Sequence, residues 1–336
     1  MALGMENRRR KLYGLAFGVI LLLISMVISI LFGLHRFDIN DLWQAYRHFD
    51  GSNEHLIITT TRVPRALIAA AVGASLAIAG AIMQVLTKNP LASPSLFGIN
   101  SGAVLFIVIG LAAYGSSLTM SGMIWIAFAG AAITSLFVFT LGVQGTGGFD
   151  SIKLTLAGAS VAAFASSITS GIILINKDSL DSALFWMVGS VSGRKLDHLV
   201  IVAPYLAIGL LIALLLSGSL NVMALGDDSA KSLGQRMMLV RMLSALAVVL
   251  LAGSAVSAAG PIAFVGLIVP HLCRSIVGND HRWLLPYCAL SGAVLLVIAD
   301  IVSRFVLMPK EVPVGVTTAL IGVPFLIYVA RRRRHA

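Results

Sequence analysis

The sequence predicts an all-α polytopic membrane protein with about ten transmembrane helices. Two observations lead to this prediction: 58% of the 336 residues are hydrophobic and only 11% are charged, and the mean hydropathy is +0.96. No soluble core needs so much apolar surface. A run of about 20 apolar residues spans about 30 Å of hydrocarbon as a helix. Such runs recur with short polar breaks, so we expect residues 1–336 to form a single transmembrane domain.

Ten apolar segments are candidates for spans. The first, 12–34, is longer than the core of a cleaved signal and no Ala-x-Ala-like site follows it, so we expect it to remain a span. The other nine occupy residues 65–87, 95–114, 119–142, 152–175, 198–218, 238–260, 262–277, 284–303 and 314–330. Segments 95–114 and 262–277 have prolines at their starts or within them, so we expect both to be short or broken.

Basic clusters flank both ends of the apolar region. Arg8 to Lys11 precede the first span and Arg331 to Arg334 follow the last. Flanks of this kind stay in the cytoplasm, so both tails, 1–11 and 331–336, are expected there, which requires an even number of spans. The net charge of +10 therefore indicates topology and contact with anionic membrane lipids. It does not indicate nucleic-acid binding, because the basic residues lie at membrane ends and not on one folded face.

A polar segment, residues 220–234, separates the sixth and seventh spans and is cytoplasmic in this topology. From the segment alone, a plain connecting turn and a docking element are equally open. Gly226 and Asp227 can start a short helix, with the acid where the helix dipole favours it, and Gly234 can end one. On the outer side, residues 37–62 carry aromatic and acidic side chains and predict an amphipathic helix at the interface.

Few charges lie in or near the spans, and the ones to explain are Arg62, Arg65, Arg274, Asp300 and Arg304. Arg62, Arg65 and Arg304 fall at the predicted external ends of the second and ninth spans. Asp300 and Arg304 are four residues apart, share a helix face and can form an ion pair. Arg62, Arg65 and Arg304 are expected to be exposed on the outer face. There they could anchor lipid headgroups or receive acidic residues of an extracellular partner.

Catalytic and metal-binding patterns are missing from the sequence. Cys273 and Cys288 lie in or near spans and are expected to pack in the core. The seven histidines show no ligand spacing, and we find no nucleophile with a base, so neither a metal site nor a cofactor is predicted. Without a Walker A sequence, this chain is not expected to bind ATP in the usual way. Any ATP-driven motor must therefore be a separate chain.

Several long motifs resemble those of one family. They are Arg62-Val-Pro-Arg65, GAIMQVLTKNPLASPSLFGINSG (80–102), ALGDDSAKSLG (224–234), GPIAFVGLIVPHLCR (260–274), DHRWLLP (280–286), Ala299-Asp300 and VPVGVTTALIGVPF (312–325). In order and spacing, from about residue 60 to the end, they resemble the FecCD family. These are permease subunits of type II ABC importers for iron-siderophores, haem and vitamin B12.

The resemblance implies a ten-helix permease subunit in a bacterial cytoplasmic membrane. It implies pairing with a second permease subunit, identical or paralogous, around a central path. Two ATPase subunits are expected below, and a lipid-anchored or periplasmic substrate-binding protein above. The subunit itself would be non-catalytic.

The resemblance also implies roles for individual residues. Arg62, Arg65 and Arg304 would form salt bridges with glutamates of the binding protein. The segment expected to seat in a cleft of the ATPase as a coupling helix consists of Ala224, Leu225, Gly226, Asp227, Asp228, Ser229, Ala230, Lys231, Ser232, Leu233 and Gly234. Asn89 and Leu91 would form one cytoplasmic gate, and Ser151 and Ile152 approximate the other. The loop 142–150 departs from the family pattern, which weakens the second gate.

Two other transport classes explain the sequence less well. A secondary transporter needs a buried carboxylate or histidine relay at the membrane midplane, and its only candidate, Asp300, lies toward the outer end beside Arg304. A channel or receptor gives no reason for the segment 220–234. For the importer, family frequency favours a ferric siderophore as cargo, with haem or cobalamin as alternatives. The particular chelate, and whether the partner permease is identical, stay open.

Overall fold

The computed structural model describes residues 7–33, 35–143, 150–175, 180–307 and 310–332. In these residues the regular structure is helical, apart from one isolated bridge between Leu307 and Lys310. Seven helices are long and apolar enough to span a membrane, and three shorter apolar helices accompany them. Together they match the ten predicted segments one for one.

The long helices lie close to their predicted bounds. They are α1 (Arg8–Leu31), α4 (Val63–Leu86), α6 (Met120–Val143), α7 (Ser151–Ile175), α9 (Leu196–Leu215), α12 (Met237–Ala259) and α14 (His281–Phe305). The shorter ones are α5 (Ile99–Tyr114), α13 (Val265–Val277) and α15 (Val314–Arg332). As predicted, α5 and α13 are short. A separate turn, η2 (Pro94–Phe97), precedes α5, and Gly98 joins them with a φ of +70° that suits glycine.

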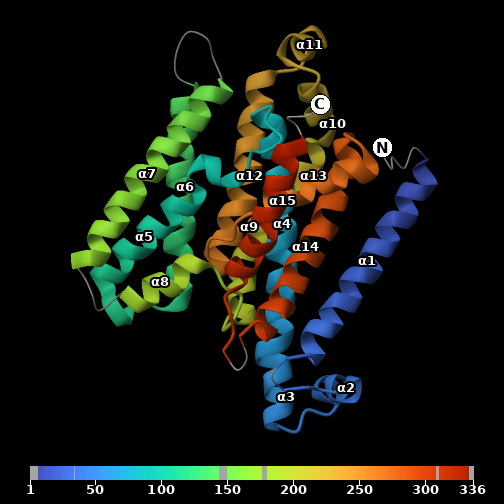
Figure 1. The fold of residues 1–336 in the computed structure, drawn as a ribbon, viewed down its shortest axis with the longest axis vertical. Helices are drawn as coiled ribbons and strands as arrows, with labels where there is room; N and C mark the ends of the chain where they lie inside the picture. The colour runs from blue at the N-terminus through green and yellow to red at the C-terminus, as the bar shows by residue number, and fades with distance from the viewer. Residues whose placement is uncertain (1–6, 34, 144–149, 176–179, 308–309, 333–336) are drawn as a thin grey trace.

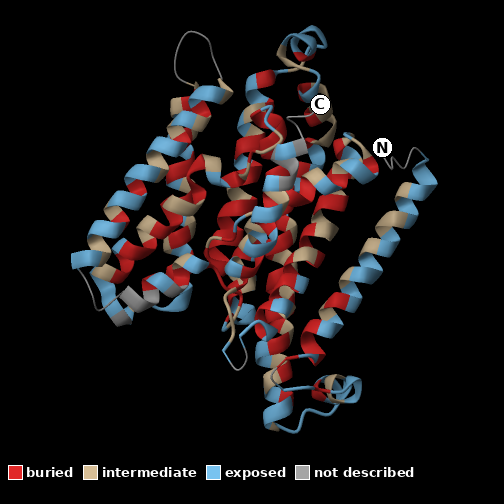
Figure 2. Cartoon of the chain, viewed as in Figure 1, coloured by how far each residue is buried: buried red, intermediate tan, exposed pale blue. Residues whose placement is uncertain are grey.

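The centre of the bundle is α4, which packs against α12, α13 and α14. Buried residues concentrate there, whereas α1 and α7 lie at the periphery and are mostly exposed (Figure 2). Small residues permit this packing: a Cβ atom on Gly73 would lie 2.2 Å from the carbonyl oxygen of Gly292, and one on Gly80 would lie 1.8 Å from that of Gly266. Close backbone approach is how helices associate in lipid, where apolar burial gives no driving force.

The second span is longer than its apolar segment predicts. The helices α3 (Asn53–Ile57) and η1 (Ile58–Arg62), a wider π-helical turn, run directly into α4, so one continuous helix covers Asn53–Leu86. The predicted amphipathic helix is present as α2 (Ile39–Arg47). It starts at a capping box in which the Asp41 carboxylate accepts a hydrogen bond of 2.7 Å from the Asp38 amide. Its Trp43 and Tyr46 side chains are exposed.

Both sides of the bundle carry further helices. The helices α2 and α3 lie at one end, and α11 (Asp227–Ser232) lies at the other, together with the start of α1 and the end of α15 (Figure 1). The predicted loop 220–234 is wrong in its first part, because residues up to Ala224 belong to helix α10 (Ser217–Ala224). The remaining short helices are α8 (Leu180–Val188) and η3 (Gly115–Ser117).

Candidate functional site

A buried charge network lies where α4 begins and α14 ends. At its centre is Asp300, whose side chain is almost fully buried. The Arg65 guanidinium donates to it through Nε, at 3.1 Å from Oδ1 and 3.0 Å from Oδ2, and through Nη2, at 2.9 Å from Oδ1. From the other side, Nη2 of Arg304 lies 2.5 Å from Oδ2 of Asp300. The predicted Asp300–Arg304 ion pair is therefore confirmed, and Arg65 completes it.

Arg304 also ties α1 to this network. Its Nη1 donates to the Ser29 carbonyl at 2.6 Å and to the Phe32 carbonyl at 3.0 Å, and its Nη2 donates to the Ser29 hydroxyl at 2.8 Å. Arg62 donates to the same Phe32 carbonyl at 3.4 Å. A Cβ atom on Gly33 would lie 2.1 Å from the Arg62 guanidinium. The end of α1 is thus shaped around two arginines.

Glu311 closes the network toward solvent. Its Oε2 accepts from Nη1 of Arg65 at 2.7 Å and from the Ser192 hydroxyl at 3.2 Å. The Glu311 side chain is 25% exposed, whereas that of Arg65 is 5% exposed. Counting Arg62, three guanidinium groups face two carboxylates, so the cluster has an excess of one positive charge. Glu311 is the member of this set that water and a partner can reach.

The arginines are not exposed, contrary to the expectation from their position. Arg62, Arg65 and Arg304 are 6%, 4% and 0% exposed. The physical reason is that the Asn53–Leu86 helix continues outward past them, and that a desolvated Asp300 carboxylate is stable only with cationic partners around it. Sequence reasoning missed Glu311 and Ser192, which lie in loops far from Arg65 along the chain. An acid beside Pro313 in a predicted outer loop was the available signal.

At the opposite end of the bundle, α11 is anchored by its first residue. The Asp227 carboxylate binds Lys88 Nζ at 2.9 Å and Arg241 Nη2 at 2.7 Å. Partial burial alone would raise the pKa of Asp227, but hydrogen bonds from Lys88 and Arg241 and the two positive charges outweigh it and hold the pKa below its ordinary value. Asp227 therefore fixes α11 to the bundle and is not free for a partner.

The predicted helix start at Gly226 and Asp227 and its end before Gly234 are confirmed. Gly226 and Gly234 have φ angles of +109° and +77°, and the Gly234 amide donates to the Lys231 carbonyl at 2.9 Å. Leu225 and Leu233 flank α11 and are 66% and 67% exposed. Asp228, Ser229, Lys231 and Ser232 are at least partly exposed as well. The segment therefore offers a short rigid helix with a mixed apolar and charged surface.

The two predicted gate segments lie at this same end of the bundle. The Asn89 side chain accepts a hydrogen bond of 3.0 Å from the Leu91 amide, and the Asn89 carbonyl accepts one of 3.0 Å from Ala92, so 89–92 is a tight turn after α4. Ser151 begins α7, and Ile152 is 71% exposed. Of the departing loop 142–150, residues 144–149 lie outside the described part of the chain.

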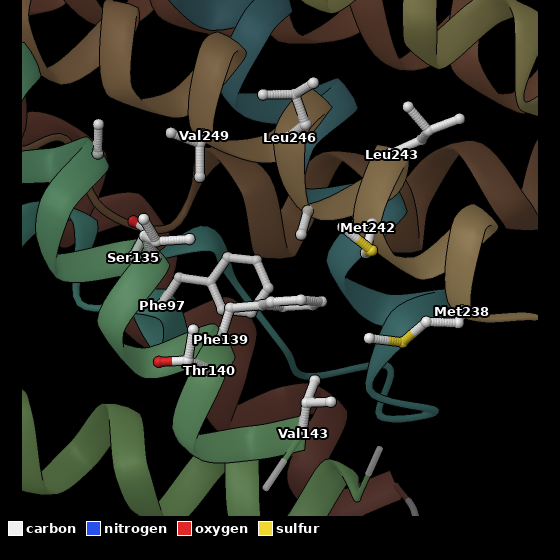
Figure 3. Close-up of a pocket in the computed structure, with 13 residues that line it drawn as sticks. Phe97, Ser135, Phe139, Thr140, Val143, Met238, Met242, Leu243, Leu246 and Val249 are labelled. Carbon is white, nitrogen blue, oxygen red and sulfur yellow. The ribbon is translucent and has the colours of Figure 1, made fainter. Parts of the chain in front are cut away.

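A cavity lies elsewhere, between α6 and α12. It has a volume of about 760 Å³, and Phe97, Phe139, Met238 and Met242 point into it (Figure 3). None of its lining residues is charged. Such a surface suits lipid tails or another apolar helix better than a charged chelate.

Among the described residues, no group of three or more potential metal ligands comes together. Cys273 and Cys288 are both buried and unpaired by disulfide, as expected for core residues. The fold and the placement of charge thus define a polytopic helical membrane protein, with polar sites at its two ends and an apolar middle.

The comparisons with known proteins identify the family. The model of the FecCD transport family matches residues 21–332, so the chain belongs to that family. It is 50% identical over 94% of both chains to the "Probable siderophore transport system permease protein YfiZ" of Bacillus subtilis (strain 168). It is 44% identical, over the same shares, to the Fe(3+)-citrate import system permease protein YfmD of that organism.

More distant relatives extend the match. The ferric enterobactin transport system permease protein FepD of Escherichia coli (strain K12) is 42% identical over 94% of both chains. A solved structure described as a putative metal-chelate type ABC transporter in an inward-facing conformation superposes with a TM-score of 0.84 at 29% identity, covering 95% of this chain and 98% of that one. This chain is therefore a non-catalytic, multi-pass permease subunit of an ABC importer, and ATP hydrolysis belongs to a separate ATPase. Such a subunit works with that ATPase and with a substrate-binding protein.

Proposed function

We propose that this permease carries a ferric siderophore across the bacterial cytoplasmic membrane, with both chain ends in the cytoplasm. The observation that supports the cargo is the 50% identity, over nearly the whole chain, to a relative named for siderophore transport. Relatives named for ferric citrate and enterobactin keep the cargo among ferric chelates. The basic flank before α1, at the same end as α11, supports the orientation.

The cargo is tested by competition. Uptake of radioactive iron would be measured in cells that depend on this permease, with catecholate, hydroxamate and citrate chelates supplied in turn and with haem and cobalamin as competitors. One ferric siderophore should support uptake, and neither haem nor cobalamin should compete. Competition by haem or cobalamin, with no siderophore supporting uptake, would contradict the assignment.

The motor interface is proposed at α11. Leu225 and Leu233 are two exposed apolar side chains on either side of a helix that Asp227 fixes rigidly to Lys88 and Arg241. A rigid helix transmits the movement of an ATPase better than a flexible turn. Burying each leucine contributes about 1.5–3 kcal/mol, so Leu225→Ser with Leu233→Ser should weaken ATPase association by at least about tenfold.

A control separates this effect from general surface damage. Leu215, at the end of α9, is 75% exposed and lies outside the coupling segment, so Leu215→Ser should leave the ATPase bound. Association would be measured by co-purification and by titration of the assembled complex. Equal loss in both variants, or no loss in either, would remove α11 as the interface.

Docking of the binding protein is proposed at Arg65, with Glu311 as the exchangeable group. Arginine suits this task because its planar fork binds a carboxylate through two hydrogen bonds. Since Arg65 is buried, a partner glutamate reaches it only by displacing Glu311, which is the exposed carboxylate on Nη1. Arg304 and Arg62 support docking indirectly, by holding Asp300 and the end of α1 in place.

If a partner carboxylate must displace Glu311, removing the Glu311 charge should raise the affinity for the substrate-binding protein. Glu311→Gln removes the competing charge, so binding of the substrate-binding protein should tighten while the fold persists. Lys310→Gln is the neighbouring charge change and should have little effect. A weaker complex with Glu311→Gln would mean that Glu311 itself is the docking group, and the Arg65 assignment would fail.

A second permease subunit is proposed to pack along α7. This helix is mostly exposed, and its outward face carries small and hydroxyl residues, among them Ser160, Ser167 and Ser170. Leu156 and Phe164 are exposed on the same helix, so its surface is mixed. Small and hydroxyl residues favour helix–helix contact within a membrane, so this surface suits packing against another subunit. The proposed gate residues Ser151 and Ile152 begin this helix, and Asn89 and Leu91 lie at the same end of the bundle.

Cysteine cross-linking tests the pairing. Both native cysteines are buried, so Ile152→Cys adds one accessible thiol at the gate. We expect it to cross-link two permease subunits in the membrane, whereas Ile133→Cys, on an exposed site of α6, should not. Cross-linking only when a paralogue carries the matching cysteine would indicate a heterodimer, and cross-linking through Ile133→Cys alone would contradict the α7 interface.

A further inference from the structure

A pocket of about 490 Å³ lies between the starts of α1 and α14. It is separate from the three interfaces proposed above and from the α6/α12 cavity. Three cations, Arg8, Lys11 and Arg282, line it, together with the Trp283 indole. Its floor includes the apolar Leu15 and Pro286. We refer to it as the α1/α14 pocket.

Specific contacts build this pocket. The Tyr287 hydroxyl donates to the Lys11 carbonyl at 2.7 Å, which joins the first turns of α1 and α14. Deeper in the membrane, Gly18 lets α1 approach α14, since a Cβ atom there would lie 3.2 Å from a methyl group of Leu290. Nearer to the helix starts, Lys11 Nζ lies 5.8 Å from the centre of the Trp283 ring. These contacts hold α1 against α14 beside the pocket.

The pocket has an excess of positive charge. Among the described lining residues, Asp280 supplies the one carboxylate. The Oδ1 atom of Asp280 already accepts hydrogen bonds from the Arg282 amide at 3.0 Å and from Asn221 Nδ2 at 2.6 Å. In the described part of the chain, none of Arg8, Lys11 and Arg282 belongs to an ion pair. Three cations against one engaged carboxylate suit a ligand with a phosphate group.

The depth of the pocket indicates where that phosphate comes from. Lys11 directly precedes the apolar run of α1, and Trp283 stands at the start of α14, where an indole marks the membrane interface. On the α1 face that carries Arg8 and Leu15, Leu12 and Val19 follow at helical spacing and are 51% and 44% exposed. Cations at headgroup level above exposed apolar side chains match a lipid and do not match a soluble anion.

We propose that the α1/α14 pocket binds the headgroup of an anionic phospholipid, whose acyl chains lie along Leu12 and Val19. The other end of α1 is held by Arg304 through Ser29 and Phe32, so the lipid fastens the end that protein contacts hold least. The proposal rests on the proposed orientation for one point, that the bound lipid belongs to the cytoplasmic leaflet. It is independent of the cargo.

The test compares two variants of equal charge. In the purified full-length permease, Lys11→Gln with Arg282→Gln removes two cations from the pocket, and Arg9→Gln with Arg10→Gln removes two neighbouring exposed cations outside it. Lipid binding would be measured by native mass spectrometry and by titration with phosphatidylglycerol in detergent, with phosphatidylcholine as the neutral comparison. We expect the pocket variant to bind phosphatidylglycerol about 30-fold more weakly, from the contribution of each basic residue near an anionic surface. The control variant should retain most of its affinity.

Two further measurements distinguish loss of the site from misfolding and a lipid from a free anion. Lys11→Arg with Arg282→Lys keeps both charges, so a correctly folded pocket should keep its affinity for phosphatidylglycerol. Inorganic phosphate should not displace the lipid, because it has no acyl chains for the apolar surface. Equal weakening in the two charge-loss variants, equal binding of phosphatidylcholine, or displacement by inorganic phosphate would each overturn the proposal. Because the readout is lipid binding, a wrong cargo assignment would leave the result unchanged.

Discussion

Replacing Asp300 by asparagine tests whether this residue holds together the start of α4 and the ends of α14 and α1. The substitution keeps the size of the side chain and removes its charge. Asp300 accepts three hydrogen bonds from Arg65 and one from Arg304. Without the Asp300 charge, the acceptors left around Arg304 are neutral oxygens, among them those of Ser29 and Phe32. Arg65 still has one carboxylate partner, the partly exposed Glu311.

The expected loss follows from the burial of these groups. Removing one partner of a buried ion pair costs about 3–5 kcal/mol, because it leaves an uncompensated buried charge. The side chains of Asp300 and Arg304 are 1% and 0% exposed, so we expect a loss in this range. Glu311→Gln is the matched comparison. Its carboxylate is partly exposed, so its loss should cost about 1 kcal/mol or less.

Both variants would be measured by equilibrium unfolding in mixed micelles, followed by tryptophan fluorescence. A double-mutant cycle with Arg304→Gln isolates the pairwise term, which should be about 1–3 kcal/mol for groups in one network. If Asp300→Asn were no more destabilising than Glu311→Gln, or if it were additive with Arg304→Gln, Asp300 would not be the centre of the network.

Three further predictions concern packing and the coupling segment. Gly80→Ala should destabilise the fold by about 1–3 kcal/mol, because its Cβ atom would meet the Gly266 backbone at 1.8 Å, whereas Gly171→Ala, with nothing within 4 Å, should be neutral or slightly stabilising in the same unfolding assay. Asp227→Asn should reduce ATP-driven uptake while ATP hydrolysis by the assembled complex persists, since Lys88 and Arg241 no longer fix α11; unchanged uptake would show that α11 needs no such anchor. Because the folded pKa of Asp227 is lowered, its stabilising contribution is complete above the ordinary value of 3.8 and is lost as the pH falls through the lower folded pKa. The difference in ATPase affinity between wild type and Asp227→Asn should therefore stay constant between about pH 5 and 8. If this difference vanished within that range, the pKa of Asp227 would not be lowered in the folded protein.

The spans were predictable because each needs a long apolar run, and membrane thickness fixes its length. Proline positions similarly predicted that α5 and α13 would be short. The π-helical turn before α4 was not predictable, because Ile58 to Arg62 are too polar to extend an apolar segment. The helical part of the predicted loop, up to Ala224, was missed because Ser217, Gly218 and Ser219 interrupt the apolar run before it.

Some contacts of the buried charge network could be predicted from the sequence and others could not. The Asp300–Arg304 pair follows from spacing along one helix. The contacts of Arg65 with Asp300 and Glu311 join residues more than 200 positions apart, and no local pattern indicates them. As a result, the arginines were expected to be exposed when they are in fact buried. The same limit hid the contact of Asp227 with Lys88, a residue whose turn also contains Asn89.

In the proposed mechanism, an ATPase drives a ferric chelate through this permease. The most direct test of this mechanism is uptake of iron-loaded siderophore into proteoliposomes that contain the permease, its ATPase and its binding protein. We predict that uptake requires ATP, stops with vanadate and continues when the proton gradient is collapsed. Uptake that is insensitive to vanadate and is abolished by collapsing the gradient would identify a secondary transporter and contradict the account.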